Sequence, residues 1–125
     1  MDAIRAFFSP KSVAIVGSAD KEGSVSRIIL DHLIEGNNFH KITVVGAKEK
    51  VYDIPLYNKV SEMPETPDLV EIVQRAEIVP ETVLDCAKAG VKSIIIISAG
   101  FKEIGEEGKK REDKILEIAR EYGVR

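Results

Sequence analysis

The sequence has few of the residues from which disulfides and metal sites are built. Among 125 residues there is one cysteine, Cys86, and there are two well-separated histidines, His32 and His40. A single cysteine excludes an internal disulfide and any CxxC pair. Two distant histidines without an HExxH motif leave little for a metal centre. We therefore expect no metal, and we expect Cys86 to pack on a helix in the core.

Charge of one sign and long apolar runs are also scarce. The chain has 18 basic and 21 acidic residues and a formal net charge of −3. It therefore lacks the basic field that nucleic acid or an anionic membrane would require of a partner. The longest apolar run, Ile94–Ile97, is too short to span a bilayer, and the N-terminus does not resemble a signal peptide. These features predict a cytoplasmic protein with no nucleic-acid or membrane partner.

Short apolar runs alternate with amphipathic segments along the chain. With 44% hydrophobic residues, the chain is long enough to bury a core as one domain. Strands are predicted at 11–17, 41–46, 68–73 and 92–98. The last run is apolar throughout, which is typical of a strand covered on both faces. Such alternation predicts an α/β fold: a Rossmann-like doubly wound parallel sheet with helices on both faces.

Three helices are predicted between and after these strands. The first presents Val25, Ile28, Ile29 and Leu33 at helical spacing and stops at Gly36. The second carries Pro80 in its first turn and ends before Gly90, and the third runs from Lys109 to Gly123. A short helix or turn is expected at 60–63. The alternation then calls for another strand, so either 124–125 begins a truncated fifth strand or the chain is a fragment of a longer one.

The loops after the strands hold the candidate site, because ligands of doubly wound sheets bind at the carboxyl ends of the strands. The first loop has two glycines and leads into a helix N-terminus, which suits a phosphate, although an ordinary strand-to-helix turn with an N-cap serine is the alternative. It matches neither GxGxxG nor the P-loop motif. Its residues are Gly17, Ser18, Ala19, Asp20, Lys21, Glu22, Gly23 and Ser24.

The other three loops offer fewer charged groups. Lys48 follows the second strand, which ends without the acidic residue typical of NAD sites. Such a lysine either meets a phosphate or is simply solvated. The third strand ends in Val73, Gln74 and Arg75, and the fourth is followed by the backbone amides of Ser98, Ala99 and Gly100. No catalytic triad or nucleophile elbow is present, so no catalytic residue is predicted.

Two segments make the sequence similar to a known family. "FFSPKSVAIVG" and "IIIISAGFKEIGEEGK" resemble the N-terminal CoA-binding domain of ADP-forming acetyl-CoA synthetases, which is shared with the succinyl-CoA synthetase α subunit. The resemblance implies coenzyme A, or acyl-CoA, as the ligand. It implies that loop 17–24 wraps the phosphates, that Lys48 contacts them, that 73–75 lies along the nucleotide and that 98–100 faces the pantetheine arm. It also implies that the catalytic phosphohistidine belongs to other ligase domains, which would be partners of this one.

The sequence departs from that family in two places. The family usually has Val-Asn-Pro-Lys after the second strand, where this chain has Val45-Gly46-Ala47-Lys48. It has an apolar, proline-ended third strand, where this chain has Glu71 and then Gln74-Arg75. An engineered or diverged scaffold that has lost CoA binding is therefore the alternative. An NAD-responsive sensor is less favoured, because the acidic residue after the second strand is missing.

Glu71 needs an explanation, because a buried unpaired carboxylate is costly. We expect first that its face of the sheet is open to solvent and second that the binding edge is altered. An ion pair with Arg75 comes third, since four residues of extended strand separate the two by roughly 13 Å. A sheet edge left uncapped by a missing strand also predicts a tendency to form homodimers.

Overall fold

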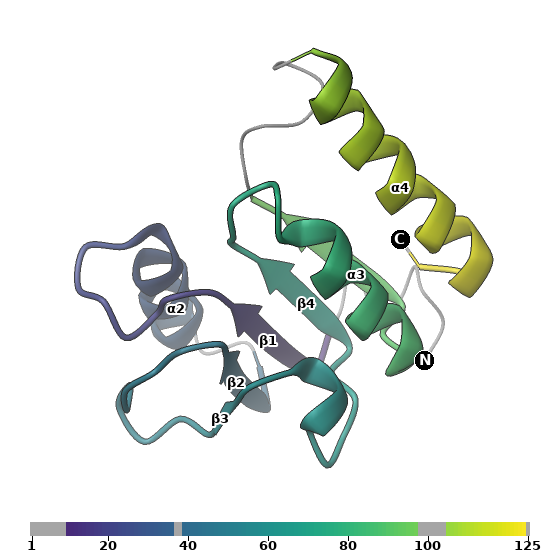
Figure 1. The fold of residues 1–125 in the computed structure, drawn as a ribbon. Helices are drawn as coiled ribbons and strands as arrows, with labels where there is room; N and C mark the ends of the chain where they lie inside the picture. Colours follow the sequence, from purple (N-terminus) through teal and green to yellow (C-terminus); the bar gives the residue numbers. More distant parts are fainter. Residues whose placement is uncertain (1–9, 37–38, 98–104, 125) are drawn as a thin grey trace.

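A parallel sheet of five strands lies at the centre of the molecule. The computed structural model describes residues 10–36, 39–97 and 105–124. The strands are β1 Ser12–Val16, β2 Lys41–Val45, β3 Leu56–Tyr57, β4 Leu69–Ile72 and β5 Ser93–Ile96. Their order across the sheet is β3-β2-β1-β4-β5, and every neighbouring pair is parallel (Figure 1). This arrangement confirms the predicted Rossmann-like α/β fold.

One strand was not predicted from the sequence. β3 consists of two residues and pairs with the end of β2, where the Gly46 N–H donates to the Tyr57 carbonyl at 2.9 Å. Two residues give no period-2 signal, so only the tertiary pairing identifies this strand. The 3₁₀-helix η1, Val60–Glu62, follows and agrees with the short helix predicted at 60–63.

The helices lie on both faces of the sheet, as predicted. α3 (Val79–Lys88) and α4 (Glu106–Tyr122) pack side by side on one face, and α2 (Val25–Gly36) lies on the other (Figure 1). α4 begins three residues before the predicted start at Lys109, and the acidic first turn that this adds suits the positive end of the helix dipole.

Val124 does not begin a truncated strand after α4, which was one of the two predicted alternatives for 124–125. Gly123 adopts a left-handed conformation with φ of 70°, as expected of a helix C-cap. The Val124 N–H donates to the Ala119 carbonyl at 2.9 Å, so Val124 belongs to the helix cap and not to a fifth predicted strand. Arg125 lies outside the described residues.

The alternation of strand residues divides the core into two layers. Val70 and Ile72 of β4 face α3, whereas Ile15 of β1 faces α2 and belongs to the same core cluster as Leu30. Cys86 is fully buried in the α3 layer, as predicted. Burial raises the pKa of its thiol to about 12.

Two expectations about buried faces are wrong. Val25 and Ile28 of α2 are 54% and 48% exposed, and the buried positions are instead Ser26 and Leu30. α2 turns a different face to the sheet from the predicted one, because the small Ser26 side chain allows the helix to approach the end of β1 closely. The predicted doubly covered strand, β5, lies at the end of the sheet and its residues 94–96 are only half-buried.

Glu71 lies in the middle of β4 on the α2 side of the sheet. Its register neighbours are Ile15 on β1 and Ile95 on β5. The residue is half-buried, and its Oε2 is shielded from solvent with no hydrogen-bond partner among the described residues. Water therefore does not solvate this oxygen, contrary to the first expectation that the Glu71 face of the sheet is open to solvent. Desolvation raises the pKa of the carboxyl group.

Candidate functional site

A cavity of about 790 Å³ opens at the carboxyl ends of β1 and β4. β1 lies centrally and connects to β2 on one side, while β4 pairs on its other side, so the cavity is at the topological switch point of the sheet. This is where doubly wound folds bind their ligands. The lining residues are Gly17, Ser18, Lys21, Gly46, Val73, Gln74, Arg75, Ala76, Glu77, Ile78 and Ile97.

The cavity brings together two of the four predicted segments. Gly17, Ser18 and Lys21 come from the loop after β1, and residues 73–75 come from the end of β4. Lys21 and Arg75 are both exposed, so two cations border this cavity. The sequence missed the wall formed by residues 76–78, because only the turn into α3 brings it there.

The remaining predicted residues lie around the cavity or outside the described part of the chain. Ala19 is fully buried in the same core cluster as Leu30, so its side chain is not available to a ligand. Asp20, Glu22, Gly23 and Ser24 complete the loop without lining the cavity. Ser98, Ala99 and Gly100 lie outside the described residues.

Lys48 is exposed in the connection after β2 and does not line the cavity. This connection is held against the first loop, because the Glu49 N–H donates to Oδ2 of Asp20 at 3.3 Å. Gly46, where φ is 87°, turns the chain out of β2 and does line the cavity. A left-handed residue of this kind favours glycine, which gives a physical reason for Gly46 at this turn.

Gly17 is the point where the ends of three strands meet. Its N–H donates to the Val45 carbonyl at 3.0 Å, and the neighbouring Val16 carbonyl accepts from the Val73 N–H at 2.8 Å. A Cβ on Gly17 would lie 2.3 Å from Oγ of Ser26 and 2.7 Å from the Val73 carbonyl oxygen. Only glycine fits here without a shift of the backbone.

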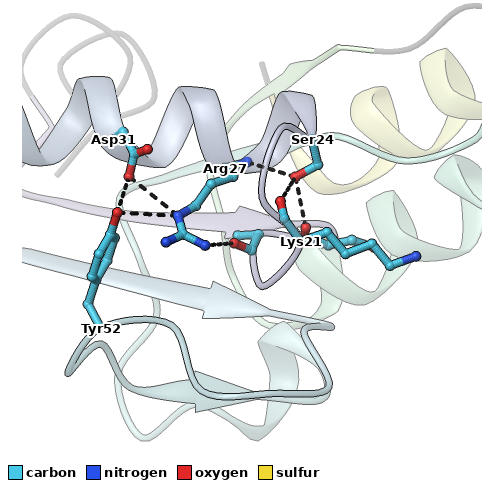
Figure 2. A network of polar contacts seen from close by, with 7 residues as sticks. Lys21, Ser24, Arg27, Asp31 and Tyr52 are labelled. Atoms are coloured by element: carbon cyan, nitrogen blue, oxygen red, sulfur yellow. Dashed lines mark hydrogen bonds and ion pairs between the residues drawn. The ribbon is translucent and has the colours of Figure 1, made fainter.

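The loop after β1 is closed on itself by Ser24. The Ser24 hydroxyl lies 2.9 Å from the Ser18 carbonyl and 2.8 Å from the Lys21 carbonyl, and its oxygen accepts from the Arg27 N–H at 3.1 Å (Figure 2). Ser24 thus acts as an N-cap for α2, as the alternative interpretation of the sequence held. The same side chain also shapes the loop, so the two interpretations are compatible.

A cluster of three side chains was missed from the sequence. Arg27 on α2 donates through Nε to the Tyr52 hydroxyl at 3.3 Å and through one terminal nitrogen to the Ala19 carbonyl at 3.3 Å. The Tyr52 hydroxyl donates to Oδ1 of Asp31 at 2.7 Å (Figure 2). The hydrogen bond with Tyr52 raises the pKa of Arg27, so the guanidinium stays charged.

Gln74 connects this cavity to a second one. The Thr82 hydroxyl at the start of α3 donates to Oε1 of Gln74 at 2.6 Å. A neighbouring cavity of about 420 Å³ shares Gln74 and Gly46 with the first and extends between η1 and α3. The two cavities therefore adjoin each other at Gln74 and Gly46.

The two histidines lie away from this edge of the sheet. His32 is exposed on α2, and His40 lies before β2, at the opposite end of that strand. Within the described ranges, no three His, Cys, Asp or Glu side chains gather closely enough to hold a metal ion. None of the helices in this part of the chain is long and apolar enough to cross a membrane.

Comparison with curated proteins finds relatives among acid–CoA ligases. The ADP-forming acetate–CoA ligase I subunit alpha of Pyrococcus furiosus is 41% identical over 128 positions, which cover 98% of this chain and 28% of the relative. The ADP-forming 4-hydroxybutyrate–CoA ligase of Nitrosopumilus maritimus is 36% identical over 116 positions, which cover 93% of this chain and 17% of the relative. The chain thus spans less than a third of these curated relatives.

Solved structures and a family model agree with these relatives. The dinucleotide-forming acetyl-coenzyme A synthetase 1 of Ca. Korarchaeum cryptofilum, in complex with phosphate and ADP, superposes with a TM-score of 0.89 at 30% identity, covering 99% of this chain and 26% of that one. The model of the CoA binding domain family matches residues 11–125. This chain is therefore a member of the CoA binding domain family, homologous to the corresponding segment of ADP-forming acid–CoA ligases.

Proposed function

We propose that this domain holds CoA along the carboxyl ends of β1, β2 and β4, as the CoA site of an ADP-forming acid–CoA ligase. The observation that carries the proposal is the cavity at the switch point, where a glycine-bearing loop and two cations converge. CoA carries a diphosphate and a 3′-phosphate, so it needs local positive charge on a chain whose net charge is −3.

Each part of the site has a proposed role. The loop at 17–24 wraps the phosphates with its backbone amides, and Lys48 supplies a cation from the connection after β2. Residues 73–75 lie along the nucleotide, with Gln74 between the two cavities. The pantetheine arm runs toward 98–100, which lie outside the described residues.

The chemistry of the ligase is assigned to other parts of the enzyme. No catalytic role is proposed for any residue of this domain, and no metal is invoked for CoA binding. The partners proposed are the remaining ligase domains or subunits, and the compartment is the cytoplasm. An engineered or diverged scaffold that folds but no longer binds CoA is the alternative that the first experiment addresses.

Isothermal titration of the chain with CoA, dephospho-CoA and NAD tests this proposal. We expect CoA to bind, dephospho-CoA to bind more weakly because it lacks the 3′-phosphate, and NAD to bind least. The measurement is accompanied by a thermal unfolding scan. A cooperatively folded protein that gives no heat with CoA would contradict the proposal and support the scaffold that has lost its ligand.

Replacing Lys48 with alanine is expected to weaken CoA binding about fivefold, because one exposed phosphate–cation contact is worth about 1 kcal/mol. The dependence of the dissociation constant on salt should also become less steep, since screening acts on that contact. Lys50→Ala is the matched control, because Lys50 lies in the same connection and pairs with Asp53 at 3.3 Å. Equal losses in the two variants would show a general field effect and no specific contact.

The sheet edge at β5 leads us to expect weak homodimerisation. β5 ends the strand order, and Ile97 just beyond it is 37% exposed. Edge strands of this kind pair with other chains unless they are protected. Light scattering over a concentration series should show a rising mean mass, and a constant monomer mass up to high concentration would refute the expectation.

A further inference from the structure

The Arg27 side chain joins two segments that are far apart in sequence. One terminal nitrogen donates to the Ala19 carbonyl in the loop after β1, and Nε donates to the Tyr52 hydroxyl in the connection after β2, both at 3.3 Å. The guanidinium carbon also lies 4.6 Å from the centre of the Tyr52 ring. Figure 2 shows this side chain lying between the first loop and Tyr52.

Tyr52 is held in place for this contact at a conformational cost. It is the non-glycine residue with positive φ in the described part of the chain, at 50°. Its hydroxyl accepts from Arg27 and donates to Oδ1 of Asp31, so both of its hydrogen-bonding roles are used within the cluster. A left-handed tyrosine with a fully engaged hydroxyl points to a function for this geometry.

The Arg27 charge is already compensated inside the cluster. Nε lies 3.5 Å from Oδ1 of Asp31, one helical turn along α2, and the Arg27 side chain is only 17% exposed. A guanidinium that is paired with a carboxylate and bonded to a backbone carbonyl is poorly placed to bind a phosphate directly. Its contacts act on the shape of the loop instead.

We propose that Arg27 is a positioning residue for CoA binding and that Tyr52 and Asp31 hold it in place. We call these three residues the clamp. The inference rests on the CoA site proposed above. The clamp holds the Ala19 carbonyl so that the loop amides face the phosphates, and it keeps the connection that carries Lys48 against this loop. The bond between Glu49 N–H and Asp20 provides a second link between the same two segments.

Tyr52→Phe and Arg27→Lys test the clamp by titration with CoA. Tyr52→Phe removes one hydroxyl and leaves every charge in place, yet it should weaken CoA binding about fourfold. Arg27→Lys keeps the charge but cannot reach the Ala19 carbonyl and Tyr52 together, so binding should weaken about tenfold. The double variant should bind about as weakly as Arg27→Lys alone, because both changes act on one unit.

Tyr122→Phe on α4 is the matched control, since it removes the same atom far from the site, and its affinity for CoA should equal that of the unaltered chain. The salt dependence separates positioning from direct contact. In Tyr52→Phe and Arg27→Lys the slope against salt should be unchanged, because both variants keep every charge and the bond between the Glu49 N–H and Asp20 still holds the connection that carries Lys48. Unaltered affinity in Tyr52→Phe would overturn the proposal. A further variant, Arg27→Met, removes the charge, and a reduced salt slope in it would also overturn the proposal, because it would show that the guanidinium contacts a phosphate directly.

A second readout does not depend on CoA. Hydrogen exchange of the backbone amides at 18–24 should become faster in Tyr52→Phe than in the unaltered chain, with the same thermal midpoint. If the unaltered chain fails to bind CoA, the proposed function is wrong, but this exchange experiment still tests whether the clamp holds the loop. Equal exchange rates in Tyr52→Phe and the unaltered chain would show that Tyr52 does not hold the loop.

Discussion

Gly17→Ala is expected to lower the free energy of unfolding by about 3 kcal/mol, the upper range for overpacking a tight site, and to abolish CoA binding. The added Cβ would lie 2.7 Å from the backbone oxygen of Val73 and 2.3 Å from Oγ of Ser26. Oγ of Ser26 is a side-chain atom, whereas the Val73 carbonyl is backbone just after β4, where the Val73 N–H is bonded to the Val16 carbonyl at 2.8 Å. The loop must therefore move away from β4, which deforms the cavity between them.

Urea denaturation and CoA titration measure the two effects. Gly23→Ala in the same loop is the control, because a Cβ there meets no atom within 4 Å and only the left-handed φ of 81° opposes it, at a cost of about 1 kcal/mol. Adding Ser26→Ala to Gly17→Ala should recover less than half of the lost stability. Complete recovery would place the collision at Ser26 alone and would leave the contact with Val73 without consequence.

Glu71→Val is expected to raise the free energy of unfolding by about 2 kcal/mol at pH 7, because it removes a shielded oxygen without a hydrogen bond, a defect that costs about 1–3 kcal/mol. The oxygen in question is Oε2, which has no partner among the described residues. Valine is also well suited to a strand between Ile15 and Ile95. Chemical denaturation measures the gain, and a less stable Glu71→Val chain would contradict it.

The pH dependence isolates the charge from the packing. Desolvation raises the folded-state pKa of Glu71 above its ordinary value of 4.5. The folded state then binds the proton more tightly than the unfolded state, so this group reduces stability as the pH rises through the folded-state pKa. Relative to Glu71→Gln, the unaltered chain should match most closely below pH 4.5, lose stability between pH 4.5 and the folded-state pKa, and differ by a constant amount above that pKa. Parallel stability curves would show that the carboxyl group titrates as it does in the unfolded chain.

The parts of the fold that were predictable are those with a periodic signal. The runs that became β1, β2, β4 and β5 are apolar and β-branched, and their alternation with helices fixes a parallel sheet. β3 was missed because pairing with β2, and no pattern of its own, makes it a strand. The buried face of α2 was misjudged because Val25 and Ile28 are more apolar than Ser26, while the close approach of α2 to Gly17 demands a small residue.

The candidate site also has residues that the sequence predicted and residues that it did not. The rule that ligands bind at the carboxyl ends of strands located the loop at 17–24 and the segment at 73–75, which do share a cavity. It could not find Tyr52, because a residue in an irregular connection is placed by its tertiary contacts. The rule also could not predict where Lys48 lies relative to the cavity, since the turn at Gly46 sets the direction of the connection after β2.

The single cysteine has a consequence for the handling of a ligand that is itself a thiol. CoA ends in a sulfhydryl group, and thiol–disulfide exchange requires an accessible thiolate on the attacking partner. Cys86 is fully buried, and its pKa of about 12 leaves almost no thiolate at neutral pH. A domain whose one thiol is inert can therefore meet oxidised or reduced CoA without forming a mixed disulfide.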